Sequence, residues 1–166
     1  TRDGGRNVSI WSEAKTYLID GRTVRAVRGH ALTITAPEAE PSEVAPERLL
    51  AVFPLYVVPP PDDAVRFDGP RIIAAVTTPA CVVGDPLRSD GISERVAVIL
   101  GAYVDARYLE PLATMKRDLR VWRMDGLSAR GIENHTPLAF DDGERRLVVM
   151  PRLDTYGAVR VVTVTP

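Results

Sequence analysis

The amino-acid sequence predicts a mainly β protein, an antiparallel barrel or sandwich that carries one amphipathic helix. Short segments with strand-like alternation or continuous apolar character recur along the chain, and turn residues separate them. We count about eight such segments and no regular strand–helix alternation of the kind that indicates a parallel sheet. The 166 residues are expected to form a single domain, with residues 8–36 as an alternative N-terminal β-meander subdomain.

The first strands are expected as a three-strand meander over residues 16–35. Asp20-Gly21 separates the run 16–19 from the strictly alternating run 22–28. Asp-Gly between two such runs is typical of a tight β-hairpin, because both residues tolerate positive φ. The run 31–35 also alternates, with Leu32 and Ile34 on one side.

Residues 36–48 are rich in Pro and Glu, which indicates a surface connection with at most one helical turn. The apolar run 49–58 is then expected to be a buried strand, interrupted or bulged at Pro54. Two further runs, 71–78 and 95–100, are short and nearly continuous in apolar residues. They are expected to be central strands with both faces covered. Cys81, between these two runs, is expected to be a small buried hydrophobic residue.

The predicted helix spans residues 105–123, with its amphipathic part at about 108–123. Five large apolar residues recur there at spacings of 3, 3, 4 and 3, and they are Leu109, Leu112, Met115, Leu119 and Trp122. The end of this segment, 121–124, is also compatible with a strand. After a polar loop, residues 141–144 are expected to form a hairpin turn, and the runs 145–150 and 158–165 are expected to be the last strands, with a turn at Tyr156-Gly157.

Composition excludes several classes of site. A single Cys cannot form an internal disulfide framework, and two His in the whole chain make the usual N/S metal site improbable, so we expect no metal. Nucleotide-binding glycine loops and a nucleophile elbow are absent from the sequence, which favours no cofactor, no catalytic residue and no enzymatic activity. The longest apolar run has ten residues, too few for a membrane span. Without a secretory signal, a cytoplasmic or intracellular location is expected.

The net charge of −1 is a sum of opposed blocks. Residues 1–30 carry +3, residues 37–68 carry −5 and residues 107–130 carry +3. Blocks of opposite sign favour packing of one segment, or one subunit, on another, although solvated faces explain them as well. The chain also contains 19 Arg and only 2 Lys, a composition compatible with an anion-binding surface.

One basic stretch is a candidate nucleic-acid site. If it is helical, Lys116, Arg120 and Arg123 lie on one stripe, with Arg117 nearby and Trp122 alongside. Clustered Arg with an aromatic side chain is suited to a phosphate backbone with an unstacked base. A solvated face or a subunit contact explains the same pattern.

Residues 66–166 resemble the PemK/MazF-like small β-barrel proteins, which are toxin endoribonucleases and their relatives. The segments that carry this resemblance are Gly69-Pro-Arg-Ile-Ile-Ala-Ala-Val-Thr-Thr-Pro79 and the strand 95–100. The resemblance implies that Arg71 matches the arginine that the family places near its RNA cleft. Gly101-Ala102 stands where the family has its catalytic threonine, so this chain would be a degenerate member.

Two functions follow as hypotheses. The first is a non-enzymatic binding or assembly protein that self-associates or binds a protein partner, for example as a subunit of a phage-like particle found in the virion. The alternative is a nucleic-acid-acting β-barrel of the PemK/MazF-like class that uses Arg71 and the stretch 116–123. Neither hypothesis requires a small-molecule cofactor or a membrane.

Overall fold

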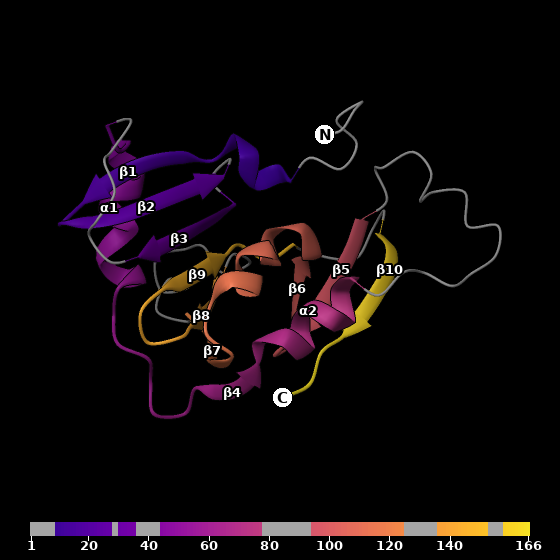
Figure 1. Ribbon diagram of the computed structural model, residues 1–166. Helices are drawn as coiled ribbons and strands as arrows, with labels where there is room; N and C mark the ends of the chain where they lie inside the picture. Colours follow the sequence, from indigo (N-terminus) through magenta and orange to yellow (C-terminus); the bar gives the residue numbers. More distant parts are fainter. Residues whose placement is uncertain (1–8, 28–29, 36–43, 78–93, 125–135, 153–157) are drawn as a thin grey trace.

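The computed structural model describes residues 9–27, 30–35, 44–77, 94–124, 136–152 and 158–166. Within these residues a large sheet of seven strands dominates the molecule (Figure 1). Every neighbouring pair in it is antiparallel. In spatial order its strands are β1 (Lys15–Ile19), β2 (Arg22–Val27), β3 (Ala31–Thr35), β9 (Arg146–Val149), β8 (Leu138–Asp141), β7 (Asp118–Arg123) and β4 (Val65–Asp68).

A smaller sheet and four helical segments complete the described fold. The smaller sheet has the order β10 (Ala158–Thr163), β5 (Glu94–Ile99) and β6 (Ala102–Asp105). β10 is parallel to β5, and β5 is antiparallel to β6. The helical segments are the α-helices α1 (Glu47–Tyr56) and α2 (Gly69–Thr77) and the 3₁₀ helices η1 (Ile10–Glu13) and η3 (Ala106–Thr114).

The large sheet buries both of its faces. One face packs against α1, and Val24, Trp122 and Val148 of the sheet share a core cluster with Phe53 and Tyr56 of the helix. The opposite face contributes to a second, larger cluster with α2, η3 and the smaller sheet. Side chains alternate between the two faces of a strand, so the strands of the large sheet contribute to both clusters. Within the described residues, the sheet therefore lies between α1 on one face and α2, η3 and the smaller sheet on the other (Figure 1).

The predicted mainly β, sandwich-like class is confirmed, and the described strands form two open sheets with no closed barrel. The meander over residues 16–35 is confirmed as β1, β2 and β3. Asp20 and Gly21 have φ angles of 51° and 77°, as the predicted hairpin turn requires. β3 also pairs with β9, so the meander is continuous with the rest of the large sheet.

The prediction of a buried strand at 49–58 is wrong, because this segment forms α1. Phe53 and Tyr56 are buried while Leu50 and Pro54 are exposed, which is the pattern of a helix with one apolar face. Pro54 is accommodated within the helix. A ten-residue apolar run is compatible with either structure, and here packing on the sheet selects the helix.

The run 71–78 is also a helix and not the expected central strand. It belongs to α2, in which Ile72 and Val76 are buried one helical turn apart and Arg71 and Thr77 are exposed. This segment is one of the two that carry the family resemblance. The other, 95–100, forms a strand as expected, β5.

The long helix predicted at 105–123 is wrong. Residues 106–114 form the 3₁₀ helix η3, and residues 118–123 form strand β7, so the strand-like alternative for the end of the segment is correct. Leu109 and Leu112 do share a face, because a spacing of three matches one 3₁₀ turn. Leu119 and Trp122 instead join different core clusters on opposite faces of the sheet.

The hairpin at 141–144 and the two last strands are confirmed as the β8–β9 connection, β9 and β10. β10 differs from the antiparallel expectation because it pairs in parallel with β5. Three strands of four residues each, β4, β6 and β8, were not predicted from the sequence. Cys81, the connection 36–43 and the turn at 156–157 lie outside the described residues.

Candidate functional site

An apolar groove of about 380 Å³ lies between α1 and the large sheet. Leu49 and Val52 of α1 form one wall, and Leu32 and Val148 of the sheet lie on the other side. Clefts of this size and apolar character are the usual form of small-molecule sites. Phe53 and Tyr56 pack fully on the sheet, whereas the lining residues Leu49 and Val52 are only partly buried.

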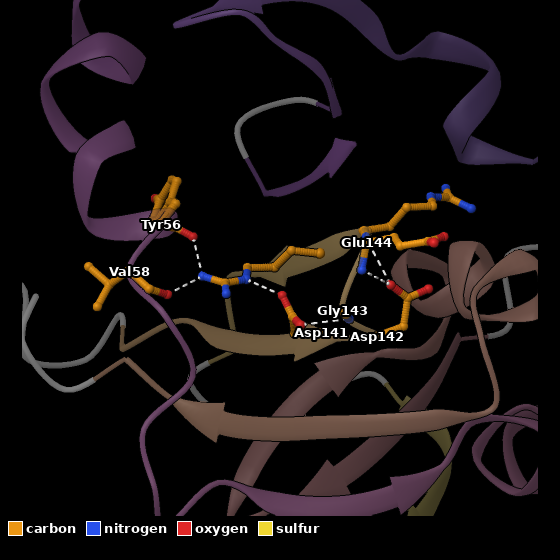
Figure 2. Close-up of polar contacts among 8 residues, drawn as sticks. Tyr56, Val58, Asp141, Asp142, Gly143 and Glu144 are labelled. Atoms are coloured by element: carbon orange, nitrogen blue, oxygen red, sulfur yellow. Dashed lines mark hydrogen bonds and ion pairs between the residues drawn. The ribbon is translucent and has the colours of Figure 1, made fainter. Parts of the chain in front are cut away.

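Arg146 holds the C-terminal end of α1 against the sheet. Its Nη1 donates to the backbone oxygens of Tyr56 at 2.7 Å and Val58 at 2.6 Å, and its Nε donates to Asp141 Oδ2 at 2.8 Å (Figure 2). The guanidinium also lies over the ring of Trp122, 4.8 Å from its centroid. The residue is only 8% exposed. These contacts join the last turn of α1 to β9, β8 and β7, and so fix the helix that forms one wall of the groove.

Two tyrosines bring unpartnered hydroxyl groups to the groove. Tyr17 is 8% exposed and Tyr56 is 6% exposed, and both side chains line the groove. Neither hydroxyl makes a hydrogen bond within the described part of the chain. Neither hydroxyl is a fully buried atom, since the only buried side-chain nitrogen or oxygen without a partner among the described residues is Arg145 Nε, so both remain accessible as polar contacts for a bound molecule.

The rim of the groove carries a cationic and a titratable side chain. Arg48, in the first turn of α1, is exposed and has no carboxylate partner among the described residues. His30 lies at another part of the rim, and its backbone is fixed by hydrogen bonds with Val27 and Met150. The exposed acidic residue Glu47 precedes Arg48 but is not part of the groove lining. The mouth of the groove is therefore positively charged at Arg48.

Burial raises the pKa of Tyr56 above its ordinary value of 10.0, since the apolar surroundings disfavour the phenolate. The unfolded chain therefore ionises first as pH rises. The contribution of the neutral Tyr56 side chain to stability is complete below about pH 10, and it is lost as pH increases through the raised pKa of the folded state. We expect thermal unfolding to show a steeper loss of stability above pH 10 in the native chain than in Tyr56→Phe, measured by circular dichroism. Equal slopes for the two proteins would contradict this prediction.

A second, polar cleft of about 250 Å³ lies at the C-terminal end of α1, bounded by Arg22, Arg145 and the β8–β9 hairpin, and Tyr56 lines both clefts. The hairpin carboxylates are already used by backbone amides: Asp141 accepts from Gly143, and Asp142 accepts from Glu144 and Arg145 (Figure 2). This confirms the hairpin-turn interpretation of the acidic sequence. No cluster of three or more potential metal ligands is found among the described residues.

Of the basic stretch predicted as a nucleic-acid site, the first two residues are paired with carboxylates. Lys116 Nζ lies 3.0 Å from Glu144 Oε2, and Arg117 Nε lies 2.6 Å from Asp68 Oδ1. These pairs join the start of β7 to the β8–β9 hairpin and to β4. All four side chains are at least partly exposed, so each pair contributes little to stability.

The other residues of that stretch do not form one stripe, because β7 is a strand. Arg120 and Arg123 are both exposed and lie three residues apart in β7. Because side chains alternate between the two faces of a strand, this separation places them on opposite faces. Trp122 is 8% exposed and its ring is covered by Arg146, so it is not free to stack on a base. The structure therefore places Arg120 on the same face as a ring that is already covered, and Arg123 on the other face.

Arg71 lies apart from this stretch. It is exposed on α2, and its Nη1 is 3.4 Å from the backbone oxygen of Pro166. α2 packs on the face of the sheet opposite α1, whereas Arg120 lies on the α1 face beside Trp122. Arg71 and Arg120 thus do not line a common groove within the described residues.

The edge of the smaller sheet offers a different kind of surface. Among the described strands, β10 pairs with β5 and has no neighbour on its other side. The Val164 amide donates to Val98 O at 2.9 Å, and backbone groups alternate in direction along a strand. The N–H and C=O groups of Val161 and Thr163 therefore point away from β5. Both residues are exposed, Val161 by 49%.

Three features were not predicted from the sequence: the groove, the Arg146 cluster and the open edge of β10. The groove had a signal, since Leu49, Val52, Phe53 and Tyr56 follow helical spacing, but the continuous apolar run favoured a strand. The Arg146 cluster had none, because its carbonyl partners are 88 and 90 residues away in the chain. The open edge of β10 follows from sheet order, which the sequence does not determine.

Comparisons of the chain with protein-family models, curated proteins and solved structures find no match. The resemblance to the PemK/MazF-like proteins therefore stays a prediction. No helix in the described part of the chain is both long and apolar enough to cross a bilayer.

Proposed function

We propose that this chain is a non-enzymatic binding and assembly protein that associates with a second copy of itself through the edge of β10. The supporting observation is the outer edge of this strand, which no described strand pairs with, and Val161 is exposed near its centre. An open strand edge presents unpaired N–H and C=O groups that can pair with another strand. Most natural edge strands are protected against such pairing by Lys, Pro or strong bulging.

β10 has little of this protection. Its sequence, Ala-Val-Arg-Val-Val-Thr, contains no Lys and no Pro, and its register shift is confined to the start between Ala158 and Arg160. Two copies of β10 placed antiparallel about a two-fold axis would join the two smaller sheets into one continuous sheet. The exposed Val161 side chains would then be covered by the partner copy.

The opposite end of the molecule offers a second edge. β1 is an outer strand of the large sheet within the described residues, and its Leu18 is 47% exposed. Figure 1 shows β1 and β10 at opposite ends of the molecule. A subunit of a larger particle needs contacts with two neighbours, so this arrangement supports the assembly hypothesis beyond a simple dimer.

The nucleic-acid alternative has weaker support. Its aromatic residue, Trp122, is covered by Arg146, and its cations lie on different faces or are paired with carboxylates. Arg120 lies beside Trp122, but Arg146 already covers that ring, and Arg123 lies on the opposite face of the strand. We therefore favour protein–protein association over RNA or DNA binding.

The test is the dependence of molar mass on concentration, measured by light scattering coupled to size exclusion. We expect the native chain to dimerise or assemble further as concentration rises, and Val161→Lys to stay monomeric, because a charge at the centre of an edge strand blocks pairing. Val44→Lys is the matched control, since Val44 is 93% exposed and lies outside both edges. It is expected to assemble like the native chain.

Val161→Pro separates loss of pairing from loss of folding. The Val161 N–H points away from β5, so replacing it by Pro removes no hydrogen bond within the smaller sheet. The missing N–H and the proline ring instead block pairing at the outer edge. Circular dichroism verifies that each variant is folded. A native chain that is monomeric up to about 0.5 mM, or assembly unchanged in both Val161 variants, would refute the proposal.

A further inference from the structure

We propose that the groove beneath α1 binds a linear apolar carboxylate that carries a hydrogen-bonding oxygen toward its far end. This inference does not rest on self-association, because α1 and β10 lie at opposite ends of the molecule (Figure 1). The groove volume of about 380 Å³ falls within the range of small-molecule sites. Its walls are mainly aliphatic, with Leu32, Val52 and Val148 among them.

The charge at the rim selects the head group. Arg48 is exposed and has no carboxylate partner among the described residues. Its planar guanidinium matches a carboxylate with two parallel hydrogen bonds, while its aliphatic stem extends the apolar wall. Pro46, which precedes α1 and also lines the groove, has no side chain that caps the helix amides. The positive end of the helix therefore adds to the attraction for an anion.

The buried tyrosines define the second polar contact. Tyr56 is 6% exposed and lines the groove. Its hydroxyl makes no hydrogen bond with any described residue. Arg48 and Tyr56 are eight residues apart on α1, about 12 Å along the helix axis. This separation suits a medium-length alkyl chain with its carboxylate at Arg48 and a hydroxyl or carbonyl oxygen near Tyr56. Tyr17 offers another hydroxyl in the same lining.

The alternative occupant is an apolar side chain of a partner protein. Arg48 at the rim and the two phenols of the lining favour the amphiphile, since an aliphatic side chain would make no polar contact with any of the three. A small molecule with one anionic end and one distal oxygen satisfies both ends of the groove.

The test uses ω-hydroxydecanoate, decanoate and 1-decanol as probes, below their self-aggregation concentrations, by isothermal titration with the full chain. We expect ω-hydroxydecanoate to bind with 1:1 stoichiometry and more tightly than either of the others. Arg48→Met keeps the apolar stem and removes the charge, so it should weaken both carboxylates about tenfold and leave 1-decanol unchanged. Tyr56→Phe should abolish the preference for ω-hydroxydecanoate over decanoate.

Two further variants make the result specific to the groove. Ala26→Leu fills part of the lining and should weaken all three probes. Arg22→Met is the matched control, because Arg22 is exposed and lines the polar cleft instead. Arg22→Met should leave the affinity for all three probes unchanged. Absence of saturable binding, which a groove reserved for a protein side chain would also give, overturns the proposal. Equal binding of 1-decanol and the carboxylates, or equal losses in the Arg48 and Arg22 variants, overturns it as well.

Discussion

Replacing Arg146 by Ala is expected to lower the free energy of unfolding by about 3–5 kcal/mol, the usual cost of removing one partner from a buried ion pair. The variant leaves the Asp141 carboxylate, whose side chain is 15% exposed, without its cation. It also leaves the carbonyls of Tyr56 and Val58 without their donor. Chemical denaturation followed by circular dichroism measures the change.

Two substitutions control this experiment. Arg146→Lys keeps the charge but lacks the planar fork that reaches two carbonyls and a carboxylate together, so an intermediate loss is expected. Arg120→Ala removes an exposed Arg from the neighbouring strand and should change stability by no more than about 0.5 kcal/mol. A loss below about 1 kcal/mol in Arg146→Ala would show that its contacts contribute little to the fold.

Hydrogen exchange shows where the destabilisation acts. Because Arg146 joins the last turn of α1 to the sheet, we expect the amides of residues 51–56 to lose protection in Arg146→Ala before those of β8 and β9. Uniform loss of protection across the large sheet would mean that Arg146 stabilises the hairpin and not the helix contact.

The sequence predicted those elements whose structure follows from local chemistry. The β1–β2 hairpin requires positive φ at Asp20 and Gly21, and Asp-Gly supplies it directly. The strict alternation of residues 22–27 matches a strand between two buried faces, with Val24 and Val27 in different core clusters. Such patterns do not depend on what the segment packs against.

The errors concern apolar runs whose structure depends on tertiary packing. Residues 49–56 and 71–77 are short, apolar and partly β-branched, and both are compatible with a strand or a helix. In the structure each packs across a sheet face through residues one turn apart, such as Ile72 and Val76. The open edge of β10 likewise follows from its parallel pairing with β5, which the sequence does not specify. The groove therefore had only an ambiguous signal in the sequence, and the open edge of β10 had none.

Phe53→Ala is expected to cost about 3–5 kcal/mol, because Phe53 is fully buried and its removal leaves a cavity between α1 and the sheet. Phe53→Leu retains most of the apolar volume and should cost less than Phe53→Ala. Leu50→Ala is the control on the same helix, since Leu50 is 47% exposed, and a change within about 0.5 kcal/mol is expected. Equal effects of Phe53→Ala and Leu50→Ala in denaturant titrations would contradict the packing of α1 described above.

Combining Phe53→Ala with Arg146→Ala tests whether α1 docks as one unit. Phe53 packs the middle of the helix on the sheet, and Arg146 binds its last turn. If either change alone detaches α1, the second change has no docked helix left to release. The double variant should then lose less stability than the sum of the single losses, by about 1–3 kcal/mol. Additive losses would instead mean that the two residues stabilise separate parts of the fold, with α1 docked in each single variant.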